Sequence, residues 1–184
     1  MDVMPFDELN TLKEKLPSHF ENGVLKSEQD KEDIIDEMLD LFLLAVANGS
    51  ASANDDLGTD YHLGTKSAID IVDRDVAGKT WRERVDEYYQ NGGTIGDYLR
   101  IIETETHRDA NEGAYVTATK AGAKKKVWHC MMLVSSRDTH IYLNGVEAPI
   151  DGEFYSFNGG STKFPGEWGI AEEDCGCLCW LTYK

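Results

Sequence analysis

The stretch TIGDYLRIIETETHRDANEGAYVTATKAG, from Thr94 to Gly122, decides how this chain is organised. Its apolar residues Tyr98, Ile101 and Ile102 recur at helical spacing, and Gly122 is a typical helix stop. Helical patterns precede this stretch, whereas short strand patterns follow it. We therefore expect an α+β fold, in which an N-terminal helical lobe is followed by a small antiparallel β-sheet lobe packed on this last long helix. The predicted regions are an acidic helical region, 1–93, and a helix-plus-sheet domain, 94–184.

Three further helices are predicted upstream of Thr94. The first carries apolar residues from Phe6 to Leu16, and Pro17 ends it. The second begins after Ser27 as N-cap and ends at Gly49, so that 50–64, rich in Ser, Asn, Asp and Gly, is expected to be a loop. The third extends from Lys66 to Gln90, with its apolar residues facing inward.

The chain after Gly122 predicts short strands and turns. Residues 127–134 (VWHCMMLV) are typical of a buried strand, and residues 141–150 contain Asn144-Gly145, a strong hairpin signal. Gly159-Gly160 predicts another turn. Residues 177–183 predict a final strand.

The net charge restricts the partners that the protein can bind. The 184 residues include 18 Lys and Arg against 34 Asp and Glu, a net charge of −16. Residues 1–112 carry 26 acids and 11 bases (net −15), and residues 113–184 carry 8 acids and 7 bases (net −1). Such a chain repels phosphate backbones and anionic lipids, so we expect neither broad nucleic-acid binding nor membrane binding.

Localisation signals favour a reducing compartment. The longest apolar run, 41–47, falls far short of the roughly 20 residues that span a bilayer. The N-terminus, MDVMPFDELN, has no basic start and no apolar segment, so we expect no secretory signal. Three of the four cysteines are crowded into CGCLC, 175–179, which is a poor disulfide framework.

A polar cluster on the long helix is the first candidate site. Glu105 and Asp109 are four residues apart and share a helix face, and Arg108 can pair with Glu105. From the spacing alone we expect a solvated charged face; the alternative is a cluster that anchors the helix to the sheet lobe or holds a ligand. Lys124-Lys125-Lys126, the basic run that follows, is expected to cap a helix end or to stay solvated.

Two histidines provide a possible acid and base. His107 and His140 could act with Arg108 in a small enzyme, a nuclease or an ADP-ribosyl- or nucleotidyl-transferring domain, as general acid, base and anion binder. The sequence contains no nucleophile elbow, HExxH motif or phosphate-binding glycine loop. A histidine without such a partner is more often structural, so we expect no catalytic residues and no enzyme.

The cysteine cluster is a candidate metal site. Cys175 and Cys177 with His140, and Cys130 or His129 as a fourth ligand, are chemically suited to zinc. On a flat strand, however, alternate sulfurs lie about 7 Å apart, so only a bend at Gly176 would bring them together. We therefore favour a set of small buried hydrophobes with no bound metal or other cofactor, and keep zinc as the alternative.

In order along the chain, residues 100–184 carry a pattern of TETHR, KxW, RxxH, LxG, PG and CxC. This pattern resembles the C-terminal domain of tailed-phage minor head proteins, the Mu gpF-like or SPP1 gp7-like head morphogenesis group. The matching positions are Thr104, Glu105, Arg108, Asn111, Trp128, Arg137, His140, Gly145, Phe154, Pro165, Gly166, Cys175 and Cys177. Leu133 and Ser135 depart from it, because the group usually has Asp-x-Arg there.

The resemblance implies a virion protein made in the bacterial host cytoplasm, which associates with the portal and other head proteins in head assembly or DNA delivery. It also implies a trimmed or prophage-encoded member, and a structural role for the matching residues. Glu105 would pair with Arg108 or Arg137, and His140 would fix the hairpin. The apolar stripes of the N-terminal helices and the acidic face would be the docking surface. A zinc-stabilised binding module is a further alternative.

Overall fold

The computed structural model describes residues 4–184, so the first three residues of the predicted acidic region lie outside it. Seven α-helices, one 3₁₀ turn and seven short strands are present among these residues. They are α1 (Phe6–Lys15), η1 (Leu16–His19), β1 (Phe20–Glu21), β2 (Val24–Leu25), α2 (Glu28–Leu57), α3 (Thr65–Val72), α4 (Trp81–Asn91), α5 (Ile95–Ala121), β3 (Lys125–His129), α6 (Asp138–Leu143), β4 (Glu147–Pro149), β5 (Phe154–Tyr155), β6 (Ser161–Thr162), α7 (Ala171–Asp174) and β7 (Trp180–Tyr183).

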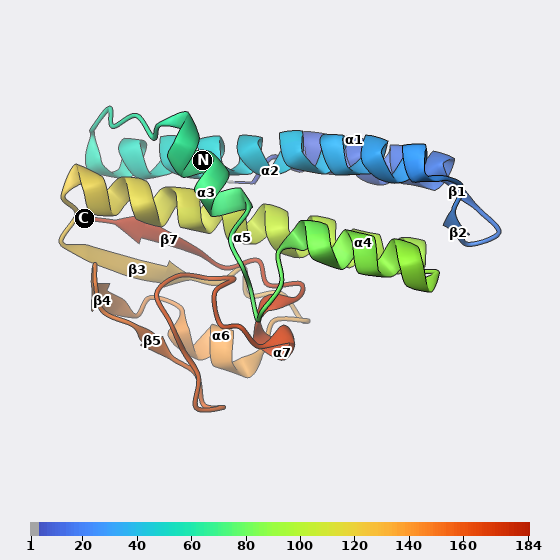
Figure 1. Ribbon diagram of the computed structural model, residues 1–184. Helices are drawn as coiled ribbons and strands as arrows, with labels where there is room; N and C mark the ends of the chain where they lie inside the picture. The colour runs from blue at the N-terminus through green and yellow to red at the C-terminus, as the bar shows by residue number, and fades with distance from the viewer. Residues whose placement is uncertain (1–3) are drawn as a thin grey trace.

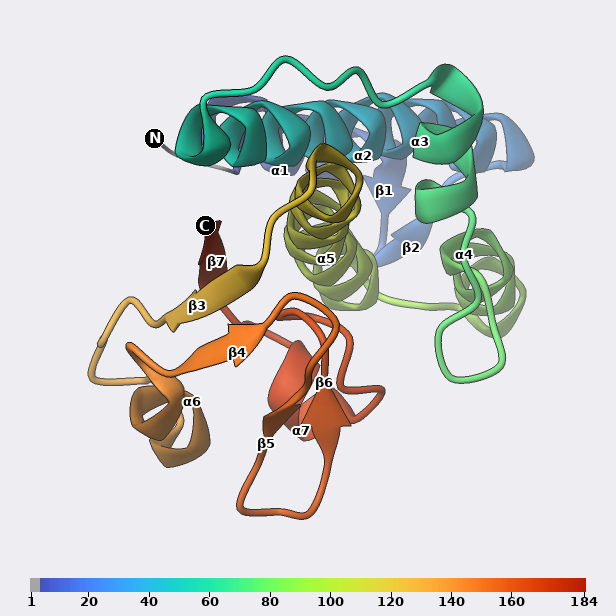
Figure 2. The same ribbon diagram turned by 90° about the vertical axis from the view of Figure 1, so that its left-hand side faces the viewer.

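Helix α5 is the centre of the molecule. The helices α1 and α2 lie on one side of it, and the strands β3, β4 and β7 lie on the other, with α6 and α7 beyond them (Figures 1 and 2). The α+β prediction, with the sheet lobe packed on the last long helix, is confirmed. The predicted ends of that helix are also correct, because Thr94 and Asp97 form a capping box and Gly122 adopts the left-handed conformation that ends it.

The contact between α2 and α5 corrects the prediction for Gly49. We expected Gly49 to end its helix, but α2 continues to Leu57, and the predicted loop begins only after that residue. A Cβ on Gly49 would lie 1.8 Å from the carbonyl oxygen of Ala110, and one on Gly113 would lie 2.5 Å from that of Val46. The glycines are therefore needed for the close approach of two helix backbones, not for a helix end.

The predicted helix 66–90 is wrong, because it is two helices. Between α3 and α4, Ala77 and Gly78 have positive φ, and Val76 forms an isolated bridge with Lys79. Thr80 then begins α4 with a capping box to Glu83. A local turn and a strong new cap thus outweigh the apolar periodicity that continues through the segment.

The sheet lobe differs from the prediction in three places. The order β4-β3-β7 is antiparallel throughout, with Trp128 opposite Leu181, but β3 ends at His129 and 131–134 form an exposed loop. Asn144-Gly145 ends α6 instead of turning a hairpin: Gly145 has φ 81°, and its amide donates to the Trp128 carbonyl at 2.7 Å. The last strand begins at Trp180, so the cysteines precede it.

Two apolar cores share α5. The first joins the helices α1 to α4 to the N-terminal part of α5, through Tyr98 and Ile102 among others. The second joins Ala114 and Ala118, farther along the same helix, to the sheet lobe around Trp128. The boundary between 93 and 94 stays a prediction. Within residues 4–184, none of the helices combines the length and apolar character that a membrane span requires.

Candidate functional site

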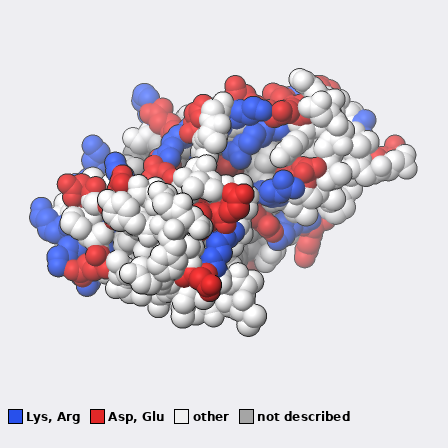
Figure 3. Space-filling model, turned by 90° about the horizontal axis from the view of Figure 1, so that it is seen from below, with Lys and Arg blue, Asp and Glu red and all other residues white. Residues whose placement is uncertain are grey.

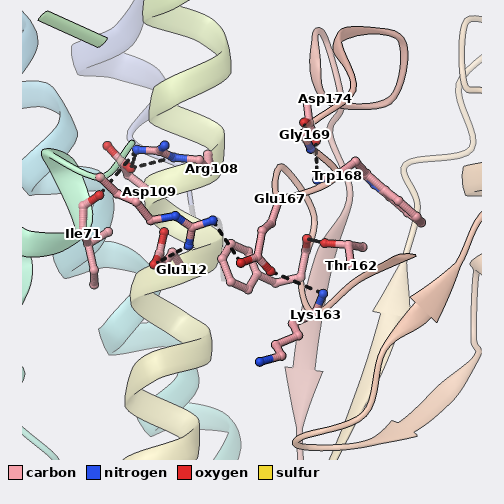
Figure 4. A network of polar contacts seen from close by, with 12 residues as sticks. Ile71, Arg108, Asp109, Glu112, Thr162, Lys163, Glu167, Trp168, Gly169 and Asp174 are labelled. Atoms are coloured by element: carbon pink, nitrogen blue, oxygen red, sulfur yellow. Dashed lines mark hydrogen bonds and ion pairs between the residues drawn. The ribbon is translucent and has the colours of Figure 1, made fainter. Parts of the chain in front are cut away.

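A buried ionic network lies on α5, where the spacing of the residues predicts a solvated charged face. Arg108 is 1% exposed, and its Nη2 lies 2.9 Å from both Glu105 Oε2 and Asp109 Oδ1. Figure 4 shows its contact with Asp109. The same nitrogen reaches the carbonyl oxygen of Ile71 on α3, and Glu105 also pairs with Arg84 on α4. The solvated-face interpretation is therefore wrong, because the network holds the helical lobe together from inside.

Burial and the neighbouring charges shift the pKa of two groups in the network. Burial opposes the charge on Arg108, but Asp109 and Glu105 outweigh it and raise the pKa of the guanidinium. Burial also raises the pKa of Asp109 well above its usual value, and Arg108 only partly counteracts it. The predicted alternative pairing of Glu105 with Arg137 is not present, because Arg137 instead donates to the Cys175 carbonyl.

A second ionic bridge joins α5 to the sheet lobe, and the sequence analysis missed it. Arg74, in the turn after α3, lies 2.8 Å from Glu112 on α5 and 2.9 Å from Glu167 in the loop before α7. Burial raises the pKa of Glu112, and Arg74 opposes that rise. Three separate segments meet at one guanidinium, and no local spacing in the sequence indicates such a long-range contact.

Two motif residues attach α5 to the last cysteine. His107 Nε2 donates to the carbonyl oxygen of Cys179 at 2.7 Å, and Asn111 Nδ2 donates to the same oxygen at 3.3 Å. His107 is buried within this contact. Its role in the structure is to join helix and sheet.

His140, Cys177 and Cys179 form a compact cluster. His140 Nδ1 lies 3.5 Å from the Cys177 sulfur and 3.4 Å from the Cys179 sulfur, and all three residues are buried. The structure thus places Cys179, not the predicted Cys175, beside His140 and Cys177. Gly176 turns the chain at φ 67°, so the segment is not the flat strand that would separate its sulfurs.

The two thiols differ in ionisation. A hydrogen bond from Cys179 lowers the pKa of Cys177 well below its usual value, and the same contact raises that of Cys179. Neither expected fourth ligand belongs to this group: Cys130 lines the pocket beside the cluster but is outside the set of converging ligand atoms, and His129 Nε2 lies 2.8 Å from the Thr182 hydroxyl.

Two acidic residues that the sequence analysis missed support this lobe. Glu173 Oε2 lies 3.1 Å from His140 Nε2, on the side of the ring opposite the sulfurs. Burial raises the pKa of Glu173, but hydrogen bonds from Ser156, Asn158 and Thr139 outweigh it and lower the pKa. Asp174 accepts from the amides of Trp168 and Gly169, which closes the loop before α7 (Figure 4).

Other motif residues contribute to the packing of the sheet lobe and of its contact with α5. Trp128 is fully buried, with its ring 5.0 Å from Phe154 and 5.9 Å from His140. Pro165 and Gly166 bring their loop onto α5, where a Cβ on Gly166 would lie 3.0 Å from the Cα of Arg108. Thr104 is half-buried on α5.

Lys126 corrects the prediction for the lysine run. Its side chain is buried, with Nζ donating to the Lys163 carbonyl at 2.8 Å and lying 4.8 Å from the centre of the Tyr115 ring. Burial lowers the pKa of Lys126 to about 8. Lys125 follows the expectation of a solvated lysine, pairing with Glu147 at the surface.

The predicted enzymatic trio does not share a cleft. His107 and His140 contact the same residue, Cys179, but through its carbonyl oxygen and its sulfur respectively. Arg108 is enclosed by carboxylates on α5. A small pocket of about 30 Å³ opens beside the cluster. Its lining includes Arg137, His140, Cys130, Cys177 and Cys179. It can hold a water molecule rather than a nucleotide.

Comparison with known proteins finds two relatives of parts of the chain. The minor head protein GP7 of Bacillus phage SPP1 is 35% identical over 83 residues, which are 44% of this chain and 27% of that protein. This part of the chain is similar to a phage minor head protein. An NAD(+)–arginine ADP-ribosyltransferase, EFV, of Enterococcus faecalis is 29% identical over 145 residues, which are 60% of this chain and 30% of that protein. The chain thus spans less than a third of either relative, and no protein-family profile or solved structure matches it.

Proposed function

We propose that the protein is a structural component of a phage head, which binds other head proteins, the portal among them, during head morphogenesis. The observation that carries this proposal is the 35% identity to a phage minor head protein. The Mu gpF-like pattern of motif residues in 100–184 agrees with this proposal. Several of these residues are buried and stabilise the packing of α5 and the sheet lobe, which also agrees with a structural role. A role in DNA delivery, a prophage origin and a place in the virion belong to the same proposal.

The docking surface of this proposal is the exposed underside of the sheet lobe. The predicted surface combines the apolar stripes of the N-terminal helices with the acidic face, but the stripes are buried in the first core and cannot bind a partner. In contrast, Tyr142, Tyr155 and Phe157 are each more than 60% exposed, and the rings of Tyr142 and Phe157 lie 4.6 Å apart. A broad area without charged side chains covers this underside (Figure 3). Exposed aromatic patches are typical of protein–protein interfaces.

We expect the protein to co-purify with the portal protein of the same phage. Changing Tyr142, Tyr155 and Phe157 together to Ser should weaken that binding at least tenfold, because large aromatic side chains carry much of the energy of interfaces. Surface plasmon resonance measures the affinity. Ile69→Ser, at an exposed apolar residue on α3, is the matched control and should leave the affinity unchanged.

Two results would contradict this proposal. The first is a triple variant that binds the portal as tightly as Ile69→Ser does. The second is transfer of ADP-ribose from NAD⁺ to arginine, lost in His140→Ala, which would favour the enzyme hypothesis that the second relative supports. We expect no transfer, because Arg108 and His107 are enclosed and no nucleotide-sized cleft reaches them among the described residues.

A further inference from the structure

We propose that His140, Cys177 and Cys179 bind one zinc ion through Nδ1 and the two sulfurs. These three groups come from α6 and from the segment that enters β7, so the ion would add a second link between two parts of the sheet lobe that already share the hydrogen bond from Arg137 to the Cys175 carbonyl. All three residues are buried, and their ligand atoms lie within 4.8 Å of one another. This site differs from the one expected from the sequence by the exchange of Cys175 for Cys179.

The spacing of the ligand atoms agrees with tetrahedral zinc. Zinc–sulfur bonds of about 2.3 Å and zinc–nitrogen bonds of about 2.0 to 2.1 Å at a tetrahedral angle place the nitrogen about 3.6 Å from each sulfur. The observed distances are 3.5 Å to Cys177 and 3.4 Å to Cys179. Two edges of a zinc tetrahedron, from the nitrogen to each sulfur, are therefore already close to the required length, and the third, between the sulfurs, is at most 4.8 Å.

The surroundings of His140 are those of a metal ligand. A histidine that binds zinc through one ring nitrogen commonly presents the other to a carboxylate, which fixes the ring and its tautomer. Glu173 Oε2 lies 3.1 Å from Nε2, on the side away from the sulfurs, and Thr139, Ser156 and Asn158 hold its oxygens. A thiol cluster that packed only as small hydrophobes would not need a buried, oriented carboxylate behind its histidine.

The fourth coordination position faces the pocket beside the cluster. His140, Cys177 and Cys179 all line this pocket, whose volume of about 30 Å³ is sufficient for one water molecule. Three protein ligands and a water complete the four-coordinate geometry that zinc prefers. Binding converts any thiol among the ligands to thiolate, so each such sulfur releases one proton to solvent as the metal enters.

The test is a titration of the reduced, metal-free protein with Zn²⁺, followed by native mass spectrometry. We expect about one equivalent bound, and a higher melting temperature in the zinc form. Cys177→Ser and Cys179→Ser should each lower the affinity at least a hundredfold, whereas the matched control Cys175→Ser should keep it. Glu173→Gln should lower the affinity 10- to 100-fold, because Glu173 positions His140.

Co²⁺ gives a spectroscopic measure of the same ligands. In the intact protein, Co²⁺ should produce a thiolate charge-transfer band whose intensity corresponds to two sulfurs, and this band should be unchanged in Cys175→Ser. If the Cys177 and Cys179 variants fail to fold, the rate of cysteine alkylation in the unmutated protein is measured instead of the zinc affinity of the variants. Zn²⁺ should then slow the alkylation of Cys177 and Cys179 but not that of Cys175.

The proposal is overturned by a protein that binds no Zn²⁺ under reducing conditions, or by zinc binding that is lost in Cys175→Ser and kept in Cys177→Ser. A Cys177 that alkylates quickly at neutral pH with Zn²⁺ present would also overturn it, and would indicate an activated thiolate instead. None of these results bears on binding to the portal, so the two proposals can fail separately.

Discussion

Gly49→Ala should destabilise the protein by about 3 kcal/mol, since overpacking between two helices costs roughly that amount even after the better helix propensity of Ala is counted. The new methyl group would lie 1.8 Å from the carbonyl oxygen of Ala110, so α2 and α5 must separate along their whole contact. Separation exposes the first core, because both helices line it. Urea unfolding, followed by circular dichroism, measures the change.

Gly96→Ala is the control for Gly49→Ala. Gly96 also lies within a helix, but a Cβ there would meet only the Thr94 hydroxyl at 3.7 Å. This variant should stabilise the protein by up to about 1 kcal/mol through helix propensity. If Gly49→Ala matches Gly96→Ala, the close crossing of α2 and α5 is wrong.

Arg108→Met should destabilise the protein by about 3 to 5 kcal/mol, because it removes one partner from a buried ionic network. Asp109 and Glu105 are at most 1% exposed and would lose the guanidinium that pairs with them. Met has a similar length and an apolar side chain, so lost charge rather than lost volume dominates the effect. Thermal and urea unfolding measure it.

Arg100→Met is the matched control on the same helix. Arg100 pairs with Asp97 across one helical turn, but its side chain is 56% exposed. Surface pairs of this kind contribute well under 1 kcal/mol, so this variant should be close to neutral. Equal effects at residues 100 and 108 would exclude the buried network as a source of stability.

The parts of the fold with local causes could be predicted from sequence. The long helix α5 has its own cap, apolar spacing and stop within Thr94–Gly122, and all three are correct. The predictions for Gly49 and for Asn144-Gly145 are wrong, because the sequence does not distinguish the different roles of a glycine. Gly49 permits close helix packing and Gly145 follows a short helix, whereas the sequence pattern predicts a helix end and a hairpin turn.

The candidate site could be predicted only in part, because its partners come from distant segments. His140 and Cys177 were correctly taken as neighbours in space, but the choice between Cys175 and Cys179 depends on the turn at Gly176. No pattern in the sequence indicates the contacts of Glu173 and Arg74, since each is one of many charged residues in the chain. Burial of Arg108, Asp109 and Lys126 was also unpredictable, because it depends on the loops that cover them.

Quantitative mass spectrometry of purified phage particles tests the central claim, a structural role in the head, most directly. Particles should be prepared from cells in which the gene is expressed beside its neighbouring head genes, and separated from free protein on a density gradient. We expect this protein to sediment with the heads and the triple Tyr142, Tyr155 and Phe157 variant to remain in the soluble fraction. A protein found only in the soluble fraction, with heads that assemble normally without it, would contradict the account.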